Sequence, residues 1–258
     1  TVTEGIVIEH GTDGNQFVWI PVGKIYTDTA KTEANAKNIT LGRYSWSGST
    51  GTLMQPTADN PYTSNVAITS ESHNHTEYQS TSTTSNAKAR NINDFYESVM
   101  GTAEKEGNGG YYLGRYEAGD SSNTAVANRT GTSGTSTAGT LVCKANQVPY
   151  NWIKQADASS KCQAMYANGY KTDGTGTFSS DLINSYAWDT AIMFIQTFGT
   201  KTNSSTYAST VGESSTSTSA LQTTGTNILN ATSSEDEQLN IYDMAGNCFE
   251  WSTETYSV

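Results

Sequence analysis

The segment Asn240-Ile-Tyr-Asp-Met-Ala-Gly-Asn-Cys-Phe-Glu-Trp251 decides how the rest of the chain is interpreted. It surrounds a Gly246-Asn247 pair with large apolar side chains. That pair favours a tight bend, because Gly and Asn tolerate the left-handed backbone that such bends require. Asp243 precedes the bend and Glu250 follows it. We therefore expect a sharp turn, anchored in the core by its apolar residues, with one carboxylate on each side.

The two carboxylates allow two interpretations of this bend. Calcium takes oxygen ligands from carboxylates and backbone carbonyls alike, so a hard cation could be held between Asp243 and Glu250. The alternative is a plain tight turn, in which Asp243 accepts a backbone amide and Glu250 is solvated. The spacing of the residues leaves both interpretations open.

Residues 242–251 resemble the YDMAGNVWEW core of the formylglycine-generating enzymes, the sulfatase-modifying factors. Further blocks of the chain resemble this family, in the family's order: Gln16–Val22, Tyr112–Gly119, Pro149–Ile153 and Ser185–Ile192, the last two as in members common in gut Firmicutes. The resemblance implies an α+β, C-type-lectin-like fold, which surface adhesins and the variable proteins of diversity-generating retroelements also use. We expect a single domain over residues 1–258, with about three helices around short twisted antiparallel sheets.

The resemblance also implies a metal site. In the family's enzymes, the GNVWEW segment helps to bind a structural calcium. Carried over to this chain, the ligands would be the side chains of Asp243 and Glu250 and the backbone carbonyls of Gly246 and Cys248. Calcium is therefore the expected cofactor.

The same resemblance argues against catalysis by this chain. The family oxidises a sulfatase cysteine with a cysteine pair and copper, and those cysteines lie downstream of GNVWEW, towards an RGG block. The sequence given ends at Val258, soon after Trp251, so we expect it to lack that C-terminal segment. Cys248 matches no catalytic position of the family. Leu182–Asp189 stands in place of the family's RLPTEAEWE segment. Three scattered histidines do not suggest a nucleophile–histidine–acid set either. We expect no enzymatic activity.

Composition and charge narrow the range of partners. Only 34% of the 258 residues are hydrophobic and 15% are charged, so Ser, Thr, Asn and Gly dominate, as in long polar loops over a modest core. The net charge is −11, without a cluster of Lys and Arg, which argues against nucleic-acid binding. No apolar run approaches the roughly 18 residues of a membrane span. The chain opens directly on a strand-like segment without a signal peptide, and we expect a targeting region to have been removed or left out.

Hydrophobic periodicity predicts the main elements. Strands are expected at residues 5–10, 17–22 and 111–118, and helices at about 92–103, 154–168 and 181–198. In the second strand, Val18 and Ile20 on one face and Phe17 and Trp19 on the other predict burial of both faces. The third helix is apolar nearly all round, so it should form the core together with the bend. Residues 29–89 should be irregular with short strands, and residues 119–139 and 200–226 should be polar loops.

Two further groups of residues are weaker candidates for sites. Cys143, Cys162 and Cys248 fit no zinc spacing, and a bridge between the first two is one option among several. His73-Asn-His75 offers two imidazoles, but loop histidines are usually solvated. Aromatic residues outside the main blocks could stack on a sugar or simply pack: Tyr44, Trp46, Tyr62, Tyr78, Tyr207 and Tyr256.

These observations favour a binding function over an enzymatic one. We expect a non-catalytic adhesion domain on a bacterial cell surface or a pilus-like filament, outside the cell, with a carbohydrate or protein ligand of unknown binding residues. The alternatives are a pilin-like structural subunit that packs against copies of itself and, third, a remnant of the oxidase.

Overall fold

The structure is a computed structural model that describes residues 1–47, 50–59, 74–77, 92–122, 139–150, 153, 155–166, 179–200, 224–225, 237–244 and 250–257. Its helices are α1 (Ile92–Met100), α2 (Gln155–Met165) and α3 (Ser185–Phe198), with short 3-10 turns at Val2–Glu4 and Glu33–Asn35. Its strands are β1 (Ile6–Glu9), β2 (Gln16–Pro21), β3 (Gly23–Tyr26), β4 (Ala36–Ile39), β5 (Arg43–Ser47), β6 (Thr50–Gln55), β7 (Asn74–Glu77), β8 (Gly110–Gly114), β9 (Gly119–Asp120), β10 (Leu141–Val142), β11 (Val148–Pro149) and β12 (Glu254–Ser257). The described residues thus form an α+β arrangement.

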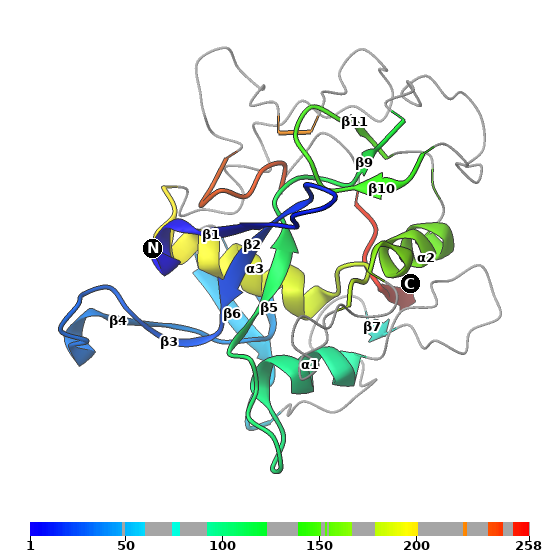
Figure 1. The fold of residues 1–258 in the computed structure, drawn as a ribbon. Coiled ribbons are helices and arrows are strands. Elements are labelled where there is room, and N and C mark those ends of the chain that lie inside the picture. The colour runs from blue at the N-terminus through cyan, green and yellow to red at the C-terminus, as the bar shows by residue number, and fades with distance from the viewer. Residues whose placement is uncertain are drawn as a thin grey trace.

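The central sheet has the strand order β1-β2-β8, and both of its pairings are antiparallel. Ile6 pairs with Trp19, and Trp19 in turn pairs with Tyr112, which fixes which side chains share a face. Val18 and Ile20 are fully buried on the inner face. Figure 1 shows α3 crossing behind this sheet, on the side to which these residues point.

Helix α3 forms the centre of the main core, as its apolar composition predicts. This core contains residues of α3, α1, β2 and β8, together with Leu41 and Ile241. The buried members are Val18, Ile20, Leu41, Val99, Tyr111, Tyr186, Ala187, Ala191, Ile192, Phe194, Ile195 and Ile241. Ile241 belongs to the bend segment and is 1% exposed, so the expectation that α3 and the bend share one core is confirmed for this residue.

The start of α3 differs from the predicted start at residue 181. The helix begins at Ser185, because the side chain of Asn184 accepts a 2.9 Å hydrogen bond from the amide of Ala187 and so caps the helix. Ser180 instead donates to the carbonyl of Cys162 at the end of α2. The predicted stop at Gly199 is confirmed.

The β5–β6 hairpin packs on α3 through polar contacts with its backbone amides. The amide of Tyr44 donates to Asp189 Oδ2 (2.7 Å), and the amide of Gly42 donates to Thr190 Oγ1 (3.1 Å). Tyr44 and Trp46 stack on each other at 5.6 Å, so packing is the role of these two aromatic residues. The β3–β4 ribbon extends away from the rest of the fold (Figure 1).

A second, smaller core lies under α2, beside the short strands β10, β9 and β11. Leu141, Tyr150, Ile153 and Ala158 are its buried residues, and Cys162 and Met165 pack against it. Ala158, Cys162 and Met165 thus share the inward face of α2, as their helical spacing predicts. Residues 119–120 were expected to be loop, yet they form the central strand β9, with Asp120 fully buried.

Three more expectations are corrected. The α1 helix ends at Met100 rather than near residue 103, because Gly101 adopts a φ of +86°. The outer face of β2, expected to be buried, has Phe17 and Trp19 only half-buried, and Tyr112 beside them on β8 is 51% exposed. Trp251, expected as a core anchor, is 47% exposed and donates from Nε1 to the carbonyl of Ile153 (2.8 Å). Among the described residues, no helix has the length and hydrophobicity needed to span a membrane.

Candidate functional site

The predicted calcium ligands fall into two groups. Asp243 and Glu250 belong to the described residues, whereas Gly246 and Cys248 lie outside them, as do residues 245–249 as a whole. The structure therefore bears on the two carboxylates and not on the two carbonyl ligands.

The backbone that leads to Asp243 is strained. Leu239, Asn240 and Asp243 have φ angles of 53°, 66° and 57°, in the left-handed region that non-glycine residues seldom adopt. The surrounding structure holds this conformation, because Gln238 and Ile241 exchange two backbone hydrogen bonds of 2.9 Å. Such strain concentrates at functional sites, since a protein must stabilise it with contacts elsewhere.

Asp243 is a buried carboxylate with 6% exposure. Its Oδ2 accepts a 3.0 Å hydrogen bond from the amide of Gly225. Gly225 is held in place by Tyr116, since a Cβ at residue 225 would lie 2.5 Å from Cε1 of that ring. The amide contact of the plain-turn interpretation is thus present.

Glu250 lies near enough to Asp243 to be repelled by it. Burial of the carboxyl group and then the negative charge of Asp243 raise the pKa of Glu250 to about 8. Although burial acts on the carboxyl group, Glu250 as a whole residue is exposed to solvent. The plain-turn interpretation expected a solvated Glu250, and the exposure of the residue agrees with that part of it.

The donor chemistry of this pair fits calcium. Asp243 and Glu250 offer hard oxygen ligands on the two sides of the bend, and a divalent cation there would displace the proton that the raised pKa keeps on Glu250. Asp243 and Glu250 would hold the ion, and calcium would supply two positive charges there. Within the described ranges, no group of three or more His, Cys, Asp or Glu side chains could hold a metal ion.

An aromatic and cationic stack fastens the bend to the end of β8. The amide of Tyr242 donates to the carbonyl of Arg115 (2.9 Å), and the rings of Tyr116 and Tyr242 stack at 5.1 Å. The Arg115 guanidinium lies over both rings, and its Nε donates to the carbonyl of Asn240 (3.2 Å). Sequence reasoning missed Arg115 as a positioning residue, although it lies within the Tyr112–Gly119 block.

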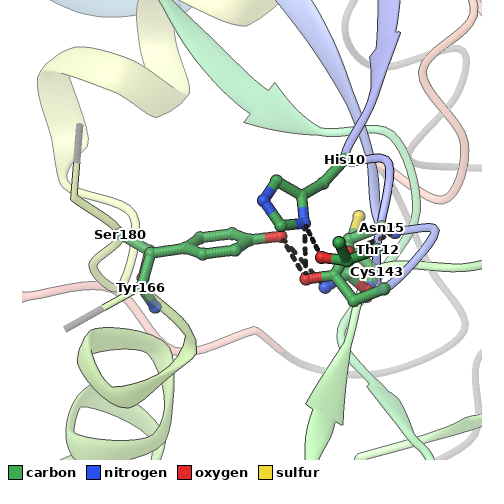
Figure 2. Close-up of polar contacts among 7 residues, drawn as sticks. His10, Thr12, Asn15, Cys143, Tyr166 and Ser180 are labelled. Carbon is green, nitrogen blue, oxygen red and sulfur yellow. Dashed lines mark hydrogen bonds and ion pairs between the residues drawn. The ribbon is translucent and has the colours of Figure 1, made fainter. Parts of the chain in front are cut away.

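A second polar cluster, shown in Figure 2, fastens the β1–β2 turn to the end of α2. Asp13 Oδ2 lies 2.9 Å from His10 Nδ1 and accepts a 3.0 Å hydrogen bond from the Tyr166 hydroxyl. Asn15 Nδ2 donates to the same hydroxyl (3.1 Å), while Asn15 Oδ1 accepts from the amide of Cys143 (2.8 Å). No sequence signal pointed to this cluster, because residues 10–15 lie more than a hundred residues from their partners Cys143 and Tyr166.

Two pKa shifts follow from these contacts. Burial acts to raise the pKa of Asp13, but hydrogen bonds from the Asn15 amide and the Tyr166 hydroxyl, with the nearby His10, outweigh burial and lower it. Burial raises the pKa of Tyr166 to about 12. Both shifts indicate a charged Asp13 and a neutral Tyr166, which is the arrangement that holds the two segments together.

The remaining candidates from the sequence are the cysteines, the histidine pair and the loop aromatic residues. Cys143 and Cys162 are free thiols, so the bridge between them is not formed. Burial raises their pKa values to about 11 and about 12, which makes thiolate chemistry unfavourable at neutral pH. His75 pairs with Tyr256 between β7 and β12, whereas His73 lies outside the described residues. Tyr62, Tyr78, Tyr207 and nearly all of residues 200–226 also lie outside them.

Comparison with known proteins adds no relative. No protein-family model matches the chain, and no curated protein and no solved structure is detectably similar to it. The resemblance to the formylglycine-generating enzymes therefore stays a prediction from the sequence blocks.

Proposed function

We propose that this chain is a non-catalytic binding domain with a C-type-lectin-like scaffold related to that of the formylglycine-generating enzymes. It acts outside the cell, on a bacterial surface or a pilus-like filament, and binds a carbohydrate or protein ligand. Calcium stabilises the scaffold through the Asp243 and Glu250 carboxylates and the carbonyls of Gly246 and Cys248. The observation that carries this proposal is that Asp243, before the bend, is buried and contributes with its charge to the raised pKa of Glu250 after the bend.

The residues around the bend explain why a cation there would stabilise the fold. Asp243 is linked to Gly225, and Thr224 exchanges backbone hydrogen bonds with residues 146 and 147 beside β11. Tyr242 and Arg115 link the same bend to β8. Neutralising the repulsion between the carboxylates would therefore stabilise contacts among segments that are distant in sequence.

A self-assembling structural subunit is the alternative, with copies of the chain as partners in a filament. The observation that favours it is the exposed apolar outer face of the β1–β2–β8 sheet, which includes Ile6 and Ile8. The charge of the chain weighs against it, because copies with a net charge of −11 repel one another. The oxidase remnant has no specific support from the geometry.

Thermal unfolding tests the calcium part of the proposal. Calcium that binds only the folded state should stabilise the wild type by about 2.7 kcal/mol at a hundredfold excess over its dissociation constant, and excess chelator should reverse this. Asp243→Ala should remove the response. Asp28→Ala is the matched control, since Asp28 lies in the β3–β4 ribbon, and it should keep the response. A wild-type midpoint indifferent to calcium and chelator would refute the calcium site.

A further inference from the structure

The outer face of the central sheet is a patch of uncharged, mostly apolar side chains. The register places Ile6, Trp19 and Tyr112 in one row across the three strands, and Ile8, Phe17 and Gly114 in the next. Exposure is 40% for Ile6, 39% for Ile8 and 51% for Tyr112. Figure 1 draws α3 on the opposite face of the sheet, and on this face Tyr166, just beyond α2, contacts Phe17. An antiparallel sheet that packs one face on the core usually carries polar residues on the other, so this face departs from that pattern.

The aromatic side chains of this patch are held in fixed positions. The Trp19 indole leans across Gly110, where a Cβ would lie 2.4 Å from Cζ2 of the ring, so only glycine leaves room for it. The ring of Tyr112 meets the indole edge-on, with centroids 4.9 Å apart at 61°. Phe17, on the same strand as Trp19, contacts Tyr166, and the two ring centroids are 6.0 Å apart. Strand pairing and glycine packing thus preorganise the patch, which lowers the entropic cost of binding a ligand.

The charge of the patch and of the whole chain indicates which class of partner this patch could bind. None of the side chains in the two rows carries a charge, while the whole chain carries −11. A second copy of the chain and an acidic polymer would both be repelled, whereas a neutral polymer would not. Neutral sugars present flat apolar C–H faces with hydroxyl groups at their edges, and aromatic side chains complement such faces with a large apolar surface.

We propose that the outer face of the β1–β2–β8 sheet binds a neutral polysaccharide, whose sugar rings stack on Tyr112 and Trp19. This proposal deepens the proposed binding function and rests on it. Tyr112 makes the most exposed contact, and its hydroxyl is a polar group that can pair with a sugar hydroxyl. Trp19 is the inner contact, supported by Gly110, and Ile6 and Ile8 extend the apolar surface at the edge of the sheet.

Affinity electrophoresis in gels that contain a neutral β-glucan, galactomannan, xylan or dextran tests this proposal. The wild type should be retarded by at least one of them and not by polygalacturonate, an acidic polymer. For the retarding polymer, Tyr112→Ala should weaken affinity at least about tenfold, because the exposed stacking surface is removed. Tyr112→Phe keeps the ring and should weaken affinity by no more than about threefold.

Two further variants separate stacking from loss of structure. Met100→Ala removes an apolar residue that is 47% exposed on α1, outside the patch, and should leave retardation unchanged. Trp19→Phe keeps an aromatic ring in the sheet and should weaken affinity, with circular dichroism as the check on folding.

Three results would overturn the proposal, each with a different consequence for the proposed function. Retardation that survives Tyr112→Ala would move the sugar site elsewhere and leave the binding function intact. Absence of retardation by every neutral polymer would remove this site without touching the calcium test. Concentration-dependent dimerisation that Tyr112→Ala abolishes would assign the patch to a second copy and favour the structural subunit.

Discussion

The side-chain nitrogen of Asn240 lies 2.9 Å from the carbonyl oxygen of Gly5 and donates a hydrogen bond to it. The start of the first strand thus rests directly on the segment that enters the carboxylate bend. Asn240 holds a φ of 66° there, and Gly5 holds a φ of 79°. The two residues of positive φ are joined by this hydrogen bond, so the central sheet and the bend are expected to depend on one another.

Replacement of Gly5 should destabilise the protein strongly. A Cβ at this residue would lie 1.9 Å from the carbonyl oxygen of Leu239, and the positive φ adds backbone strain. We expect Gly5→Ala to lower the free energy of unfolding by more than about 2 kcal/mol, measured by urea denaturation. Gly11→Ala is the matched control, since nothing lies within 4 Å of its Cβ, and it should change stability little. Equal effects of the two variants would contradict the contact.

Loss of the Asn184 cap should weaken α3. The Asn184 side chain accepts a hydrogen bond from the amide of Ala187. Because Asn184 is only 9% exposed, water would replace this hydrogen bond poorly. Asn184→Ala should cost about 1 kcal/mol in urea unfolding, and Asn184→Asp, which keeps an acceptor oxygen, should cost less. If Asp181→Ala cost more than Asn184→Ala, the helix would begin where the sequence alone placed it.

The thiols of Cys143, which is buried, and of Cys162, which is half-buried, should resist modification in the folded protein. Their raised pKa values, about 11 for Cys143 and about 12 for Cys162, leave almost no thiolate at neutral pH, and burial limits access. Labelling by a thiol reagent, followed by mass spectrometry of each peptide, should be slow in buffer and fast in denaturant. Rapid native labelling of Cys143 would show that its site opens readily.

Asp28 should titrate far below its ordinary range. Hydrogen bonds from the Thr32 side chain, the Asn35 side chain and the Thr32 amide lower its pKa to about 2. Because the folded value is depressed, the stabilisation is present above about pH 4 and is lost as pH falls towards 2. Carboxyl carbon shifts in NMR should report this value, and Thr32→Val should raise it. An unchanged pKa in that variant would rule out the hydroxyl as the main cause.

Much of the fold follows from local sequence patterns. The first hairpin, α2 and the C-terminal end of α3 lie where alternation and helical spacing predicted them, and Ile241 is a core anchor as expected. These features depend on neighbours a few residues apart, which is the range over which hydrophobic periodicity carries information.

The remainder depends on contacts between distant residues. Helix α3 begins after Asn184 and not near residue 181, where Asp181 accepts a hydrogen bond from Gln163 of α2. The Asp13–Tyr166 contact joins two segments with no shared pattern. The outer face of the central sheet is half-exposed, although its Phe17 and Trp19 predicted burial. Apolar composition predicts that a side chain can be buried, not that another element covers it.

Equilibrium dialysis with radioactive calcium tests the central claim most directly. The account predicts one bound calcium per chain in the wild type, no binding by Asp243→Ala, and weaker binding by Glu250→Gln, which keeps the size of the side chain but removes its charge. A wild type that binds no calcium, or an Asp243→Ala variant that binds it as tightly as the wild type, would contradict the account.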